Sequence, residues 1–299
     1  MTTRVTVGSS AAASLAGLQS ASARLAALQA KMSSGRQITT PSDDPAGTVR
    51  ALQLRGDLKR TTQYATNATD AIGWLSTADT TYGQIQNLLQ NARTLVVQGL
   101  NTGASTGTSA SAIADQIDAI RSSAITLANT TYQGRPIFGG TTAGGVAYQP
   151  DGSYVGDDGV VQRAVGDQNT IRINQTGTEA FGPDPSDPAG PDVFALLSNI
   201  SATLRGGAGS LSDQLGGLDG ALNRLSGARA AEGAAYQRVQ AAQTSQSADT
   251  VALQSQLSTI QDIDLPALTV QVSTANLTYQ AALQTTASIR QTSLLDFLR

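Results

Sequence analysis

The sequence predicts a mainly α protein, a nested hairpin of long coiled-coil helices with both termini paired at one end and a small β-rich insertion at the other. Apolar residues recur every three or four positions over most of the chain, the spacing of helices that pack along one face. Two such stretches, residues 45–100 and 211–264, have nearly equal lengths. The segment between them is rich in Gly, Pro, Asp and Asn. A chain that runs out along one rod, builds the insertion and returns along the other explains all three observations.

The two ends of the chain, residues 1–40 and 265–299, are expected to form one terminal coiled-coil domain. Each end carries a short apolar seam, and the last seven positions, SLLDFLR, hold four large apolar residues. A helix pair this short cannot cover all of these side chains within one molecule. We therefore expect mobile ends that become ordered on assembly. The expected partner interface consists of Leu18, Leu25, Leu28, Met32, Leu277, Leu283, Ile289, Leu294, Leu295, Phe297 and Leu298.

A joint is predicted between the first helix and the long rod, at Pro41, Asp43, Asp44 and Pro45. Pro41 is expected to end the first helix. Asp44 suits a helix N-cap, and Pro45 suits the first helical position. The alternative is that the two carboxylates form a catalytic or cation site. Adjacent carboxylates rarely converge on one ligand without further oxygen atoms, and no third carboxylate lies nearby in the sequence. We therefore favour the structural interpretation.

Residues 41–138 and 193–264 are expected to form a long helical bundle domain. On the outgoing helix, Trp74 and Tyr82 are interpreted as packing residues. The seam of the returning helix consists of Leu211, Leu215, Leu218, Leu222, Leu225, Arg229, Glu232, Tyr236, Val239 and Ala242 and, after a polar stretch, Leu253, Leu257 and Ile260.

Residues 139–192 are expected to form a β-hairpin insertion domain. The short runs VVQRAV and TIRIN alternate in the manner of strands, and Asp-Gly dipeptides punctuate the segment. Asp157, Asp158 and Gly159 are interpreted as a turn, because a calcium loop would need more oxygen ligands at regular spacing.

The composition narrows the possible functions. The sequence has no cysteine and no histidine, which removes thiol nucleophiles, imidazole bases and the usual soft metal ligands. The net charge is −3, so there is no basic surface of the kind that binds nucleic acid. We expect no catalytic residue, no cofactor, no metal site and no nucleic-acid partner.

The sequence shows neither a membrane-spanning stretch nor an ordinary signal peptide. No stretch approaches the roughly 18 consecutive apolar residues of a transmembrane helix, so we expect no membrane partner. The first residues, MTTRVTVGSSAAASLAG, lack the roughly 7–15-residue apolar core of an ordinary signal peptide. A cytosolic location and export by a route that reads no cleaved signal both fit this observation.

Four segments resemble the flagellin superfamily. KMSSGRQITTPSDDPAGTVRALQLR (31–55) is similar to its N-terminal signature, in which a Ser-Ser-Gly turn precedes an Asp-Asp-(Pro or Ala)-Ala segment. YQGRPIFGGT (132–141) is similar to a family motif at the exit from the outgoing helices. Residues 154–181 resemble the β insertion of hook–filament junction proteins, and residues 276–299 resemble their C-terminal helix. The proline-bracketed PSDDP form is closer to junction proteins than to filament flagellins.

The resemblance implies a structural adaptor that joins the hook to the filament of the bacterial flagellum. It implies export in an unfolded state through the flagellar type III apparatus, and a final location outside the cell at the hook–filament junction. The implied partners are copies of the same chain in a helical ring, the hook-side junction protein, flagellin, and an export chaperone before assembly.

Other functions stay open on the sequence alone. A filament flagellin would form long filaments by itself. An intracellular coiled-coil scaffold would form stable dimers with ordered termini. A carboxylate-dependent hydrolase would need an enclosed pocket with perturbed acids, which nothing in the sequence indicates.

Overall fold

The computed structural model describes residues 7–101, 107–183, 188–206 and 209–297, and of residues 7–11 and 289–297 it describes the backbone alone. These residues are mostly helical, and their strands form two two-stranded antiparallel sheets. The mainly α fold with a small β-rich insertion is therefore confirmed. The chain divides into two compact units, Met1–Arg60 with Thr250–Arg299, and Thr61–Asp249. The three domains drawn from the sequence have different limits and stay a prediction.

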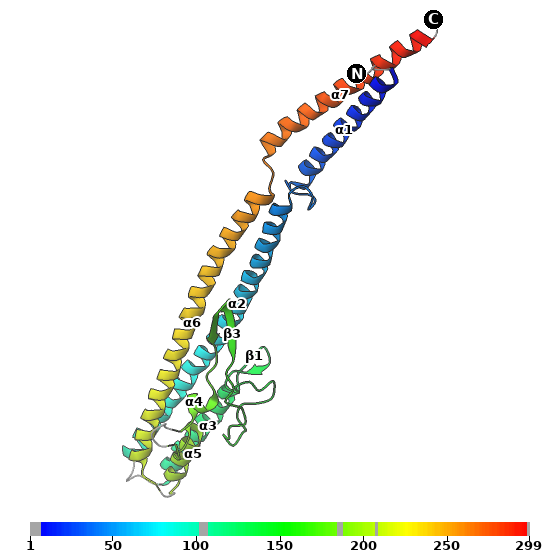
Figure 1. The fold of residues 1–299 in the computed structure, drawn as a ribbon. Helices are drawn as coiled ribbons and strands as arrows, with labels where there is room; N and C mark the ends of the chain where they lie inside the picture. The colour runs from blue at the N-terminus through cyan, green and yellow to red at the C-terminus, as the bar shows by residue number, and fades with distance from the viewer. Residues whose placement is uncertain (1–6, 102–106, 184–187, 207–208, 298–299) are drawn as a thin grey trace. The chain divides into compact units, whose positions relative to one another are not determined.

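The terminal unit is built on the first and last helices of the chain. In it, α1 (Val7–Ser34) and α7 (Leu265–Phe297) lie side by side and run in opposite directions (Figure 1). The unit also holds the first turns of α2 (Pro45–Asn101) and the last turns of α6 (Leu211–Gln261). With 57 and 51 residues, α2 and α6 are the two long rods that the sequence predicted.

The end of α1 differs from the sequence-based expectation. The prediction that Pro41 ends this helix is wrong, because α1 stops at Ser34 and Gly35 follows with a φ of 68°. The Gly35 N–H donates to the Lys31 carbonyl at 3.0 Å. Glycine adopts this left-handed conformation without steric cost and so closes the helix. Pro41 lies instead in the connector between α1 and α2.

Two connectors are tied together inside the terminal unit. The Gln37 N–H donates to the Gln261 carbonyl at 2.6 Å, and the Ile263 N–H donates to the Gly35 carbonyl at 3.4 Å. Arg36 and Asp262 form an antiparallel bridge beside them. The segment that leads into α2 and the segment that leaves α6 are therefore joined by backbone hydrogen bonds.

The second unit holds the remaining elements between the middle of α2 and the first part of α6. After α2, the helix α3 (Gly107–Ala128) is followed by a short hairpin of β1 (Thr131–Tyr132) and β2 (Arg135–Pro136). A second hairpin pairs β3 (Gln162–Gly166) with β4 (Asn169–Arg172) and has an irregular register between Ala164 and Gly166. The helices α4 (Gly177–Phe181) and α5 (Val193–Leu204) complete the unit.

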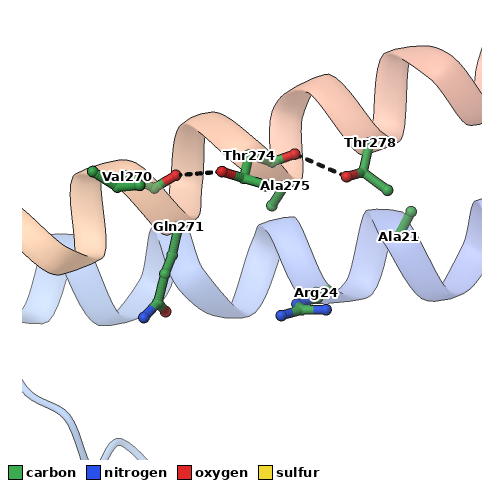
Figure 2. Close-up of a pocket in the computed structure, with 7 residues that line it drawn as sticks. All are labelled: Ala21, Arg24, Val270, Gln271, Thr274, Ala275 and Thr278. Carbon is green, nitrogen blue, oxygen red and sulfur yellow. Dashed lines mark hydrogen bonds between the residues drawn. The ribbon is translucent and has the colours of Figure 1, made fainter.

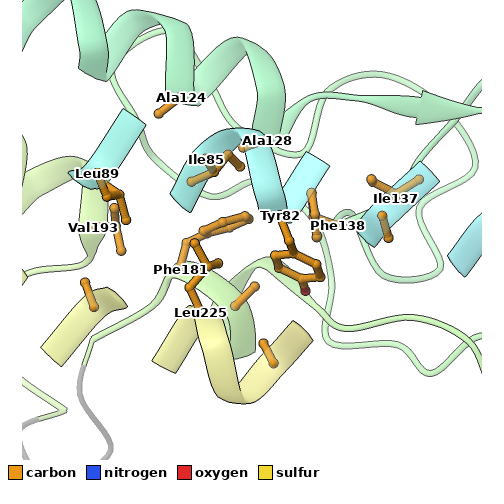
Figure 3. Packing of buried hydrophobic residues seen from close by; sticks show 14 of the residues in the cluster. Tyr82, Ile85, Leu89, Ala124, Ala128, Ile137, Phe138, Phe181, Val193 and Leu225 are labelled. Atoms are coloured by element: carbon orange, nitrogen blue, oxygen red, sulfur yellow. The ribbon is translucent and has the colours of Figure 1, made fainter. Parts of the chain in front are cut away.

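Aromatic side chains from the helices and from the inserted segment share one core. Tyr82 of α2 packs edge-on against Phe138, with ring centroids 5.1 Å apart, and Phe138 packs against Phe181 at 4.9 Å (Figure 3). Tyr148 and Phe194 extend this cluster with a centroid separation of 4.8 Å. Trp74 and Tyr82 are both buried, which confirms that they are packing residues. The inserted segment therefore packs into the core of the helices.

The Gly-Gly-Thr motif after Phe138 fixes a loop of this unit. Gly140 has a φ of 67°, and a Cβ atom there would clash with the backbone of Asp157. The Asp157 carboxylate accepts hydrogen bonds from the Thr141 N–H at 2.6 Å and the Thr141 hydroxyl at 2.7 Å. It also accepts one from the Gly159 N–H at 2.9 Å, as the turn predicted at this position requires.

Polar contacts hold the β3–β4 hairpin and the two long helices in register. The Asn67 side-chain amide of α2 donates to the Ala164 carbonyl at 2.8 Å. Arg93 of α2 pairs with Asp219 of α6 at 2.6 Å, and Arg229 of α6 pairs with Asp79 of α2 at 2.6 Å. Exposed pairs of this kind contribute roughly 0–1 kcal/mol each, so their main effect is to fix the alignment of the helices.

Candidate assembly surface

The predicted joint is formed mainly by Asp44. Its side chain accepts a hydrogen bond from the Gly47 N–H at 2.9 Å, and its carbonyl accepts one from the Thr48 N–H at 2.9 Å. This is N-cap geometry, with Pro45 at the first helical position, where its missing N–H has no cost. These contacts agree with the cap predicted for Asp44, and the assignment of the four residues to a joint stays a prediction.

Asp43 holds the preceding turn. One of its carboxylate oxygens accepts hydrogen bonds from the Thr40 N–H at 2.9 Å, the Thr39 hydroxyl at 2.8 Å and the Thr39 N–H at 2.9 Å. These bonds, first that from the Thr40 amide, hold the pKa of the Asp43 carboxyl far below its usual range. Within the described part of the chain, no group of His, Cys, Asp or Glu side chains is arranged to hold a metal ion.

The seam between α1 and α7 is made of small and medium apolar side chains. Leu18, Leu25 and Leu28 are half-buried on α1. On α7 the most covered side chains are Leu268 and Ala275, which are 5% and 8% exposed. The three leucines of α1 therefore lie partly within the molecule, and part of each remains open to a further partner.

A hollow lies between the two terminal helices, as Figure 2 shows, with a volume of about 180 Å³. The hydroxyls of Thr274 and Thr278 donate to the Val270 and Thr274 carbonyls of their own helix, both at 2.9 Å. Arg24 is the one charged residue among those that line it. Most of the other lining side chains are small, and the two threonine hydroxyls are already hydrogen-bonded to their own helix. Such a lining suits the packing of helices better than the binding and conversion of a substrate.

Several large apolar side chains of the terminal pair remain exposed. Leu277 is 67% exposed, Leu283 42% and Met32 39%, all three being residues of the predicted interface. Sequence reasoning did not include further exposed apolar residues of the same unit, namely Leu15, Val49, Leu52, Val251, Leu265 and Val270. Their signal in the sequence is an apolar residue that lies off the three-four seam, as Val270 does between Leu268 and Val272.

The remaining residues of the predicted interface cannot be placed. The side chains of Ile289, Leu294, Leu295 and Phe297 lie outside the described residues, and so does the whole of Leu298. The structure brings Leu18, Leu25 and Leu28 to the α1–α7 seam and leaves Met32, Leu277 and Leu283 exposed. The assignment of this set to a partner interface stays a prediction.

Comparison with known families covers both ends of the chain. Residues 6–143 match the bacterial flagellin N-terminal helical region, and residues 215–298 match the bacterial flagellin C-terminal helical region. The two regions together contain the whole of α1, α2, α3 and α7 and almost all of α6. The chain belongs to the flagellin family.

Two curated relatives show which kinds of flagellar protein this chain is similar to. It is 29% identical to flagellar hook-associated protein 3 of Salmonella typhimurium over 202 residues, which are 64% of this chain and 63% of that protein. It is 27% identical to the flagellin of Bacillus subtilis over 285 residues, which are 90% of this chain and 91% of that one. The chain thus spans somewhat less than two thirds of the hook-associated relative.

Solved structures share the fold of this family member. The crystal structure of Bacillus cereus FlgL matches with a TM-score of 0.59 at 24% identity, covering 69% of this chain and 99% of that one.

In the described residues, no helix combines the length and apolar character that a membrane span needs.

Proposed function

We propose that this protein is a structural, non-catalytic adaptor of the bacterial flagellum, located outside the cell at the hook–filament junction. The observation that carries the proposal is the antiparallel α1–α7 pair, on which the side chains of Leu277 and Leu265 remain 67% and 55% exposed. The relationship to a hook-associated protein supports the same function. The partners would be copies of the same chain in a ring, the hook-side junction protein and flagellin.

Assembly would proceed by lateral and axial packing of terminal helices from neighbouring subunits. A leucine side chain that becomes fully buried contributes about 1.5–3 kcal/mol. Several exposed apolar residues on the α1–α7 pair therefore provide enough free energy to hold a subunit in a polymer, once the neighbouring subunits bury these side chains. The terminal helices would gain their final order at this step, because helices of this size depend on packing for stability.

The same exposed side chains bear on the state before assembly. An unpaired apolar stripe promotes aggregation in free solution. We propose that the chain is exported unfolded, with a dedicated chaperone covering its terminal segments until export. Binding of this partner to a peptide of residues 265–299, and not to the isolated segment 139–192, would be the expected result.

A deletion strain tests the proposal directly. Cells that lack the chain should carry hooks without filaments and release unpolymerised flagellin into the medium, and complementation with the intact chain should restore filaments. Normal filaments and motility in the deletion strain would overturn the proposal.

A filament flagellin is the second candidate, favoured by the match along 91% of the Bacillus subtilis flagellin. The two candidates differ in what the purified protein does alone. An adaptor should stop at short oligomers, whereas a filament subunit should grow into long filaments visible by electron microscopy. In the deletion strain a filament subunit would leave no flagellin in the medium.

A further inference from the structure

Glu232 is a buried acid in the middle of the second unit. Its side chain lies on the packed face of α6, and the residue is only 4% exposed. The Oε2 atom has no hydrogen-bond partner among the described residues. An ionised carboxylate in such a place would lose its hydration without gaining a compensating contact, which is strongly unfavourable.

The basic groups near Glu232 are engaged elsewhere. Arg229, one turn earlier on α6, donates to both carboxylate oxygens of Asp79 on α2, at 2.6 and 3.0 Å. Arg172 at the end of β4 pairs with Glu179 of α4 and donates to the Asn174 carbonyl at 2.8 Å. Within the part of the chain that the structure describes, no basic group is paired with Glu232, and the nearby charge of Asp79 is of the same sign as its own.

Glu232 also borders a small cavity. The cavity has a volume of about 180 Å³ and is lined by Leu75, Arg172, Ile173, Asn174, Gln175, Ala231, Glu232, Ala235 and Arg238. Tyr82 of α2 does not line this cavity, but its buried hydroxyl likewise has no hydrogen-bond partner among the described residues. Arg238 on α6 is exposed at the surface. The cavity leaves room for α6 to shift when the Glu232 carboxyl loses its proton and becomes charged.

We propose that Glu232 is a proton-dependent packing element, which lets α6 pack against α2 and the β4–α4 segment as a neutral acid and loosens that packing when it ionises. The physical cause is desolvation, with repulsion from Asp79 as a smaller contribution. Together they raise the pKa of the Glu232 carboxyl to about 8. This property is separate from the adaptor function and does not depend on it.

The direction of the pH effect follows from linkage. The folded protein keeps the proton up to a pH of about 8, whereas the unfolded chain releases it near the ordinary value of 4.5. The stabilisation is complete below 4.5 and is lost progressively as the pH rises towards 8. Each pH unit in this window should lower the folding constant about tenfold through this group, and above it the effect should level off.

Direct titration is practical because Glu179 and Glu232 are the only glutamates in the sequence. In protein labelled with ¹³C-glutamate, two side-chain carboxyl signals should appear. One should titrate with a midpoint near pH 8 and disappear in E232Q. For Glu179, burial raises the pKa, but hydrogen bonds from Arg172 and the Thr176 N–H together outweigh it and leave the pKa lowered. Two midpoints both at or below the ordinary glutamate value would overturn the proposal.

Unfolding equilibria provide the second measurement. The ratio of the folding constants of E232Q and the unmodified chain should rise about tenfold per unit between pH 5 and 8 and then stay constant. E179Q serves as the matched control, and its ratio should be flat between pH 6 and 9. Hydrogen exchange at pH 9 should be faster around residues 228–239 in the unmodified chain than in E232Q. A flat E232Q ratio, or equal exchange in the two proteins, would contradict the proposal.

Discussion

Asp43 and Asp44 are neighbours in the sequence, yet their carboxylates serve two different segments. Asp43 accepts hydrogen bonds from the turn before it, at Thr39 and Thr40, and Asp44 accepts one from Gly47 inside α2. The Asp43 carboxylate therefore serves only the turn before the pair, and the Asp44 carboxylate serves only the start of α2. An acidic pair can look like a metal site in the sequence and still accept hydrogen bonds from its own neighbouring backbone.

Replacing Asp44 tests the cap. D44A removes the acceptor for the Gly47 N–H and should lower the free energy of unfolding by about 1 kcal/mol. D44N keeps an acceptor oxygen and should stay within a few tenths of a kcal/mol of the unmodified protein. Urea unfolding of the purified proteins measures both. Equal stability of D44A and the unmodified chain would show that the cap contributes nothing.

The hydroxyls of Tyr82 and Tyr154, both in the second unit, predict opposite results. Tyr82 buries its hydroxyl without a partner among the described residues, so Y82F should leave the free energy of unfolding unchanged or raise it by up to about 1 kcal/mol. The Tyr154 hydroxyl lies 2.7 Å from the Asp157 carbonyl and 3.1 Å from that of Phe138, so Y154F should cost about 1 kcal/mol. A larger loss in Y82F than in Y154F would contradict this assignment.

At the scale of the element, α7 carries two faces of different character. Ala275 is 8% exposed on the side that meets α1, and Leu277 is 67% exposed two residues later. Each residue of an α-helix turns by about 100°, so positions two residues apart, such as 275 and 277, point about 200° apart. One helix can therefore pack within the molecule and present an apolar surface outside it.

A charge placed on the inner face should separate the terminal helices. A275D introduces a carboxylate beside Ala21 and should melt the α1–α7 pair, with a loss of helical circular dichroism and faster amide exchange in residues 12–31 and 268–288. A275S, which keeps the volume small, should retain most of the helical signal. Unchanged exchange in A275D would mean that the two helices do not depend on each other.

The sequence was informative for long elements and weak at their ends. Apolar periodicity located α2 and α6 because a repeat of 3.6 residues over more than ten turns leaves little ambiguity. It missed the end of α1, which was expected at Pro41, whereas the left-handed Gly35 closes the helix six residues earlier. It also placed Glu232 on a packed seam. The lack of a counterion there depends on β4 and α4, whose contacts no local pattern encodes.

At the scale of the whole molecule, burial is unequal between the two units. Aromatic residues that are almost fully buried lie in the second unit, where Tyr82, Phe138 and Phe181 pack together. The terminal unit relies on leucine and alanine along a thin seam and leaves Leu265, Val270 and Leu277 more than half exposed. The second unit is therefore expected to fold by itself, whereas the terminal unit gains much of its stability from neighbours. The candidate site could be predicted as a region of the chain, but which leucine faces outward required the register between α1 and α7.

The most direct test of the assembly surface is filament formation in a deletion strain that produces L277D, with L277M as the matched control. L277D should keep the helical content and urea midpoint of the unmodified protein, because Leu277 makes few contacts within the molecule. It should nevertheless fail to restore filaments, whereas L277M should restore them. Normal filaments with L277D would contradict the claim that the outer face of the α1–α7 pair holds the subunits together.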